Sequence, residues 1–307
     1  MRLVTRADFD GLCCAVLLKE LHLIESFRFV HPKDVQDGKV YVDQDDIIAN
    51  LPYAAGCGYW FDHHSSETER LEYMTLFEDG LKGACEMLPS CARVIWKYFG
   101  GHDTFPKHMD EMMDAVDKMD SANLSIHEIN NPKGWILLGF IVDPRTGLGR
   151  FKKFNMDTWE LMENLSKYCR AMPVDFILTL PDLKERVETY KEQAGMFRQM
   201  IRDNAVVHGN VVVVDLRDVK PIYAGNRFAV YGLYPECNVS VQLMWDHRGR
   251  NVVFSVGYSV VNRTCAANVG QIMLSFGGGG HKAVGTCQIP AEKVDAALEE
   301  IIKRLHE

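Results

Sequence analysis

The sequence predicts an α/β protein of two domains, in which a parallel-sheet domain precedes a smaller α/β domain. In the first third of the 307-residue chain, short apolar runs that favour strands enclose a helix-like segment, as in a βαβ unit. After residue 204, strand-like runs replace a long, charged, helix-like segment. We therefore expect the first domain at residues 1–182, a helical linker at 183–204 and the second domain at 205–307.

In the first domain, we expect strands that alternate with helices. One helix should cover Gly11–Ile24, and Ser90 is placed to cap another that ends near Phe99. Pro106 should open a further helix that runs to about Asp120. The expected strands are Arg2–Thr5, Phe27–Val30, Lys39–Val42 and Tyr59–Phe61.

The second domain should contain strands at residues 211–216, 239–245 and 252–258, where β-branched residues are frequent. The last expected helix covers Ala291–Glu307. Its apolar residues fall on one face, which should pack on the sheet. They are Val294, Leu298, Ile301 and Leu305.

Composition and charge narrow the classes of function. The formal net charge of −8 argues against long nucleic acid as a partner, because that binding requires many Lys and Arg residues. No apolar run has the length of a membrane span, and the charged first residues do not resemble a signal peptide. The nine cysteines form no C-x-x-C pair, which favours reduced thiols. We expect a cytoplasmic protein that acts on a small anionic molecule and not at a membrane.

Acidic residues follow three of the expected strands. Ligands bind beyond the carboxyl ends of strands in open parallel sheets, so these residues should meet at one edge. Carboxylate and imidazole donors favour manganese, iron or magnesium. Taken singly, each acid could be a solvated loop residue or a helix cap. Asp43, alone after its strand, is the candidate to bridge two metal ions. The clusters are Asp8 with Asp10, then Asp43, then Asp62 with His63 and His64.

Two further signals concern phosphate. If His63 binds a metal ion, His64 points elsewhere and can donate a hydrogen bond to a phosphoryl oxygen. In the second domain, the glycine run at 277–280 would let the backbone approach an anion, although a flexible linker is the alternative. Arg263 is equally a phosphate ligand or an exposed surface arginine. The residues expected to bind the anion are Gly278, Gly279, Gly280, His281 and Lys282.

This ordered set of motifs resembles the DHH phosphoesterases with a DHH-associated C-terminal domain. The resemblance rests on Asp8-Phe9-Asp10-Gly11, Asp43, Asp62-His63-His64 and the GGGGHK run at 277–282. The family includes RecJ-type exonucleases, NrnA-type oligoribonucleases, cyclic-dinucleotide phosphodiesterases and exopolyphosphatase-related proteins.

The resemblance implies two divalent metal ions, manganese first, with magnesium or cobalt as alternatives. It also implies a fourth-motif aspartate, for which Asp117 is our choice and Asp120 the fallback, because spacing does not separate them. In the second domain it implies that Arg263, the glycine run and His281 hold the substrate. The implied metal ligands are Asp8, Asp10, Asp43 and His63, supported by Asp62.

One position departs from the family pattern. Many members have a histidine two residues before Asp8, where this chain has Arg6. A protonated arginine is not expected to bind a metal ion. Either one ion is held more weakly, or Arg6 contacts the substrate phosphate.

The function that these observations favour is manganese-dependent hydrolysis of dinucleotides or short linear oligonucleotides to mononucleotides. Polyphosphate, cyclic dinucleotides and 3′-phosphoadenosine 5′-phosphate are alternative substrates. A nucleotide-binding sensor with a degenerate metal site is the alternative of another class. The sequence leaves a homodimer open.

Overall fold

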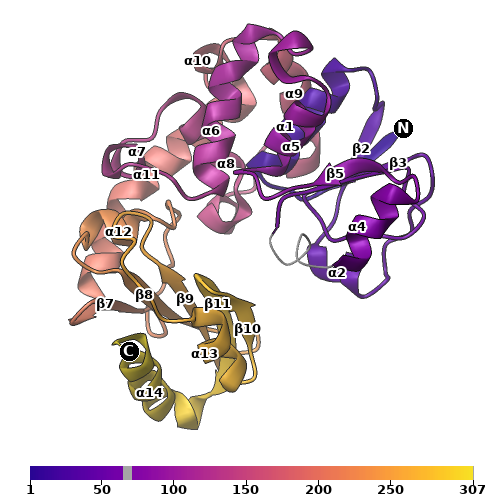
Figure 1. Ribbon diagram of the computed structural model, residues 1–307. Coiled ribbons are helices and arrows are strands. Elements are labelled where there is room, and N and C mark those ends of the chain that lie inside the picture. The colour runs from indigo at the N-terminus through magenta and orange to yellow at the C-terminus, as the bar shows by residue number, and fades with distance from the viewer. Residues whose placement is uncertain (65–70, 307) are drawn as a thin grey trace. The chain divides into compact units, whose positions relative to one another are not determined.

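The computed structural model describes residues 1–64 and 71–306, and it divides into two compact units (Figure 1). The first unit comprises Met1–Asn123 and Pro132–Glu188, and the second comprises Leu124–Asn131 and Thr189–Glu307. The division at residues 188 and 189 lies inside the helix α11 (Pro181–Asp203). Glu307, the last residue of the expected final helix, lies outside the described residues.

A five-stranded parallel sheet forms the centre of the first unit, as the sequence predicts. Its strand order is β2-β1-β3-β4-β5. The strands are β1 (Arg2–Thr5), β2 (Ser26–Phe29), β3 (Asp46–Ala49), β4 (Tyr59–Asp62) and β5 (Lys82–Cys85).

Helix α1 (Phe9–Glu20) is buried along nearly its whole length. Its sequence is apolar on every side, which is the pattern of a helix inside a protein core. It packs against α5 (Cys91–Tyr98), α6 (Asp110–Asp120) and α9 (Thr158–Ala171). The residues of its first turn, from Phe9 to Leu12, are all buried, and Figure 1 shows α1 beside α5 and α9. Other helices that the structure describes in this unit are α2 (Pro32–Gln36), α4 (Leu71–Glu78), α8 (Gly134–Val142) and α10 (Val174–Ile177).

The strand expected at Lys39–Val42 is wrong, because β3 begins at Asp46. The register pairs Asp46 with Arg2, and the Arg2 side chain donates to both Asp46 carboxylate oxygens at 2.7 and 2.8 Å. This ion pair lies at the amino ends of β1 and β3. Residues 39–42 therefore precede β3, and the side chain of Val42 packs in a small apolar cluster.

The second unit has a six-stranded sheet in the order β10-β11-β9-β8-β7-β6, antiparallel except between β7 and β8. One core lies between this sheet and the helices α13 (Val269–Ser275) and α14 (Val294–His306). As predicted, one face of α14 is buried in that core. The strands are β6 (Ala205–His208), β7 (Val211–Asp215), β8 (Val239–Trp245), β9 (Asn251–Tyr258), β10 (Gly279–His281) and β11 (Val284–Pro290).

A short segment from the middle of the chain joins this second unit. It contains α7 (Ile126–Asn130), which packs against α12 (Ala229–Leu233). The Asn226 amide donates to the Ile129 carbonyl at 3.0 Å, and Arg198 donates to the Asn130 carbonyl. No sequence pattern predicted this exchange, because it depends on contacts between distant segments.

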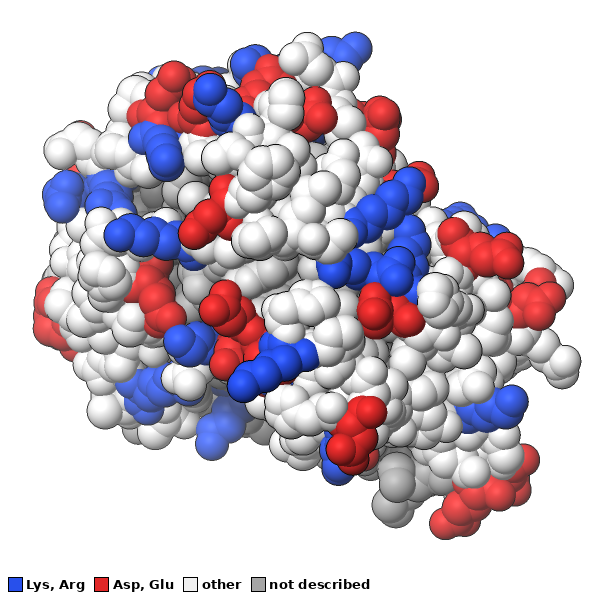
Figure 2. Space-filling view, turned by 90° about the horizontal axis from the view of Figure 1, so that it is seen from above, with Lys and Arg blue, Asp and Glu red and all other residues white. Residues whose placement is uncertain are grey.

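The charged side chains on the surface and the state of the cysteines agree with what the composition predicts. On the face that Figure 2 shows, acidic and basic side chains are interspersed. All nine cysteines have free thiols, as the sequence predicts. No helix in the described part of the chain combines the length and apolar character that a membrane span needs.

The core of the second unit yields a stability prediction. Phe254 on β9 is fully buried, so Phe254→Ala should lower the free energy of unfolding by about 3–5 kcal/mol. Ser255→Ala, at the next and exposed position, should change it by less than about 0.5 kcal/mol. Urea unfolding followed by tryptophan fluorescence measures both. Equal effects of the two substitutions would contradict this description of the core.

Candidate metal centre and active site

The turn between β1 and α1 fixes the first pair of acids. Asp8 is the N-cap of α1, and its Oδ1 accepts from the Gly11 backbone N–H at 3.0 Å. A Cβ at Gly11 would lie 2.0 Å from the Arg6 carbonyl oxygen, so only glycine fits there. The order of residues in this motif therefore follows from a tight turn that leads directly into a buried helix.

Asp10 lies in the first turn of α1, and its side chain reaches the N-terminus of α5. Its two carboxylate oxygens accept from the backbone N–H groups of Cys91 at 3.0 Å and Ala92 at 2.8 Å. These are N–H groups that the helix itself leaves without partners, and an anion is favourable there. Burial and the neighbouring Asp120 carboxylate raise the pKa of Asp10 to about 7.

His63 follows β4 and faces two carboxylates. Its Nδ1 donates to the Leu88 carbonyl at 3.1 Å, because a carbonyl oxygen only accepts. Its Nε2 lies 3.0 Å from Asp120 Oδ2 and 3.9 Å from Asp10 Oδ2. Although burial lowers it, the Asp120 and Asp10 carboxylates raise the pKa of His63 to about 10.

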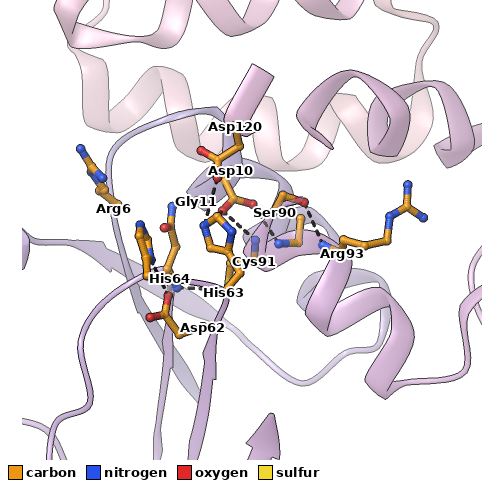
Figure 3. Close-up of polar contacts among 12 residues, drawn as sticks. Arg6, Asp10, Gly11, Asp62, His63, His64, Ser90, Cys91, Arg93 and Asp120 are labelled. Carbon is orange, nitrogen blue, oxygen red and sulfur yellow. Dashed lines mark hydrogen bonds and ion pairs between the residues drawn. The ribbon is translucent and has the colours of Figure 1, made fainter. Parts of the chain in front are cut away.

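These three residues fit a divalent cation. One ligand atom from each of Asp10, His63 and Asp120 lies within 4.8 Å of the other two. Although Nε2 of His63 is close to Asp120, it has no hydrogen-bond partner with acceptable geometry among the described residues. A buried nitrogen aimed at two carboxylates is what a bound cation would satisfy, and this mixed set favours manganese or magnesium. Figure 3 shows the three side chains pointing toward one another.

A second set of donors near Asp10 has a different character. Cys14 and Cys91 lie within 4.8 Å of Asp10, but both are buried thiols. Burial raises the pKa of Cys14 to about 12, which keeps the thiol protonated at neutral pH. We therefore assign these cysteines to the core around Asp10.

The two candidates for the fourth-motif aspartate lie in different surroundings. The Asp117 carboxylate accepts from Ser90 Oγ and Arg93 Nε, each at 2.7 Å, so it joins α6 to α5. The fallback, Asp120, is the aspartate that reaches His63, and its side chain is still 28 % exposed. Asp117 and Asp120 are three residues apart, so they lie on neighbouring parts of the α6 surface. Only the packing of α5 against α6 decides which of them contacts Arg93 and which reaches His63.

Asp43 is not brought to this cluster, and the predicted placement is wrong. It is exposed and precedes β3, at the amino edge of the sheet. Its Oδ1 accepts from the Asp45 backbone N–H at 2.9 Å. The residue that follows β3 is Asn50, which sequence reasoning missed. Its buried amide donates to Asp8 Oδ1 at 3.2 Å.

His64 and Arg6 lie beside the acid cluster. Asp62 Oδ1 accepts from His64 Nδ1 at 2.8 Å, which orients the ring, and the His64 side chain is 36 % exposed. Although burial lowers it, the Asp62 carboxylate raises the pKa of His64. The Nε of Arg6 lies 3.3 Å from Asp8 Oδ2. Figure 3 shows His64 next to His63, with Arg6 on the same side.

Arg145 is a second residue that sequence reasoning missed. Its Nε donates to both Asp143 oxygens, at 2.8 and 3.1 Å, and its positive charge acts on Asp8 and Asp120. No motif marked it, because it reaches the cluster only through the packing of α8.

In the second unit, the glycine run has a structural reason of its own. A Cβ at Gly278 would lie 2.0 Å from the Thr286 carbonyl oxygen, and one at Gly280 would lie 2.2 Å from that of Val284. The run therefore lets β10 approach β11. His281 and Lys282 are exposed, as is Arg263, whose Nε donates to the Val260 carbonyl at 3.2 Å. Their role in substrate binding stays a prediction.

Comparison with solved structures shows that the chain is strongly similar to a known enzyme. The chain is 45% identical to the pGpG-specific phosphodiesterase PggH from Vibrio cholerae, with a TM-score of 0.87 over 99% of this chain and 98% of that chain. It is also similar, in fold alone, to CDC45 from Entamoeba histolytica, at 9% identity and a TM-score of 0.51 over 100% and 95% of the two chains. No family model and no curated protein matches the chain.

The two aspartates of α6 allow a matched test of the metal centre. Asp120→Asn should weaken Mn²⁺ binding at least about tenfold, because it removes a charged donor next to His63. Asp117→Asn should leave metal affinity unchanged and instead weaken the contact with Arg93. Isothermal titration calorimetry with Mn²⁺ measures both. A loss of affinity in the Asp117 variant alone would contradict the assignment.

Proposed function

Because the chain belongs to the DHH phosphoesterases, a family of metal-dependent phosphohydrolases, we propose that it hydrolyses linear dinucleotides such as pGpG to mononucleotides. The observation that supports this choice of substrate is the 45% identity to a pGpG-specific phosphodiesterase over nearly the whole of both chains. The acidic and histidine-rich edge of the first sheet supports it independently, because phosphodiester hydrolysis needs a cation and hydrogen-bond donors at one place.

The metal would be held by Asp10, His63 and Asp120, and manganese is our first choice. When bound, a divalent ion polarises the phosphoryl group and makes water a stronger nucleophile at neutral pH. The hydrogen bond from His63 Nδ1 to Leu88 holds the ring with Nε2 toward the site. The pair of ions expected from the sequence stays a prediction, since the grouped donors support one ion.

His64 and Arg6 would act on the substrate itself. With Nδ1 held by Asp62, the Nε2–H of His64 is available to donate to a phosphoryl oxygen as negative charge develops. Arg6 keeps its charge at any working pH and carries N–H groups beyond the one that faces Asp8. Both side chains stabilise the charge of the reacting phosphate without moving a proton.

The second unit would bind phosphate through donors of its own. Arg263, His281 and Lys282 are exposed donors, and the glycine run offers backbone N–H groups close to them. A dinucleotide such as pGpG has two phosphate groups with three negative charges at most, so it needs few such donors, which agrees with the acidic net charge of −8. A homodimer has no part in this proposal.

The substrate prediction is tested with a panel of phosphate compounds. With Mn²⁺ present, the purified chain should convert pGpG to GMP, and it should act more slowly on cyclic di-GMP, polyphosphate and 3′-phosphoadenosine 5′-phosphate. Product analysis by liquid chromatography gives kcat/KM for each. If pGpG stays intact over hours, the proposal fails. Binding of nucleotide without turnover under any divalent ion would instead indicate a sensor.

A second prediction separates catalysis from metal binding. His64→Gln should lower kcat for pGpG by about 10²–10³-fold, because it removes a donor to the developing charge. Mn²⁺ affinity should be unchanged, since His64 bonds to Asp62 and not to the three metal donors. Asp43→Asn, at the amino edge of the sheet, is the control and should retain full activity. An unaltered rate in the His64 variant would exclude this role.

A further inference from the structure

The environment of Asp8 differs from that of Asp10, although both belong to one motif. Asp8 is buried, and both of its carboxylate oxygens are engaged. Oδ1 accepts from the Gly11 backbone at 3.0 Å and from the Asn50 amide at 3.2 Å. Oδ2 lies 3.3 Å from Arg6 Nε. The protein itself therefore supplies donors to both oxygens of Asp8, and the positive charge of Arg6 offsets part of the cost of burying it.

No second group of oxygen and nitrogen donors accompanies Asp8. Among residues 1–64 and 71–306, the groups of donors within 4.8 Å of one another include neither Asp8 nor Asp62. Asp62 gives one oxygen to His64 and keeps one buried oxygen without a hydrogen-bond partner. A single carboxylate oxygen does not make a cation site. Asp43, the expected bridge, lies at the opposite edge of the sheet.

Asn50 occupies the position from which a bridging carboxylate would have to reach this cluster. It directly follows β3, and its backbone N–H donates to the Phe61 carbonyl at 3.1 Å, which holds it beside β4. Its side chain is neutral, and the Asp8 carboxylate fixes its orientation, because the amide N–H group faces the oxygen. An asparagine that donates to Asp8 supplies part of what a cation would supply there.

We propose that the Arg6 guanidinium and the Asn50 amide replace a second metal ion at Asp8, so that the chain binds one divalent cation, at Asp10, His63 and Asp120. This inference deepens the proposed function and rests on it for the identity of the reaction. A guanidinium provides a permanent positive charge and directional donors, which suit a phosphate oxygen. The centre then combines one exchangeable cation with one built into the chain.

The first test is the metal stoichiometry of the unaltered chain. Calorimetric titration with Mn²⁺, and metal analysis after dialysis, should give one tightly bound equivalent per chain. Electron paramagnetic resonance of the loaded chain should show the resolved hyperfine pattern of an isolated Mn²⁺ ion. Two tight equivalents, or the broadened spectrum of two coupled ions, would overturn the proposal.

The second test creates the missing site. The double variant Arg6→Gln with Asn50→Asp removes the guanidinium and adds a carboxylate beside Asp8, so it should bind a second equivalent of Mn²⁺. Asp43→Asn is the matched control and should keep the stoichiometry of the unaltered chain. A double variant that folds, as judged by circular dichroism, and still binds one equivalent would contradict the role of Arg6 and Asn50. If it does not fold, the measurements on the unaltered chain decide.

These outcomes are distinct from failure of the proposed function. A chain that cleaves pGpG with two coupled ions would refute the replacement of the second ion and leave the reaction intact. One equivalent of Mn²⁺ without hydrolysis of pGpG would support the replacement and refute the substrate.

Discussion

The candidate metal centre of this protein depends on the contact between the Asp10 carboxylate and the N-terminus of α5. Burying a carboxylate is costly unless it is hydrogen-bonded, and here two backbone N–H groups meet that need. The same contact ties the first turn of α1 to α5. Because Asp10 is fixed in this way, its Oδ2, which accepts from the Cys91 backbone N–H, lies 3.9 Å from His63 Nε2, a distance that a shared cation would bridge.

The parallel sheet brings the other acids and the histidines to the edge where Asp10 is held. β1 and β4 run in the same direction, so the segments that follow them carry Asp8, Asp10, His63 and His64 to one edge. Burial and the Asp120 carboxylate raise the pKa of Asp10, and the nearby carboxylates raise that of His63 against the effect of burial, a sign that the cluster lacks a compensating charge. Burial also raises the pKa of Asp8, and there the Arg6 guanidinium supplies part of that charge.

In the second unit, the glycine run at 277–280 has two physical explanations, one in folding and one in binding. The glycine run was predicted as an anion site, and close approach of β10 to β11 also requires it. A role in folding does not exclude a role in binding, since the backbone N–H groups near His281 are part of the same turn. Substitution of Gly278 would therefore confuse the two roles, and the exposed Arg263 and Lys282 are the better positions to separate them.

The sequence by itself determined the two-unit α/β fold, the buried helix after Asp8 and the pair of acids, Asp8 and Asp10, that begins this helix. These features are local, because apolar periodicity, a tight glycine turn and an N-cap are set by neighbouring residues. The tertiary structure decided which strand lies between β1 and β4, through the ion pair of Arg2 with Asp46. It thereby excluded Asp43 and brought in Asn50. It also separated Asp120 from Asp117, because Arg93 on a distant helix takes one of two carboxylates that spacing leaves equivalent.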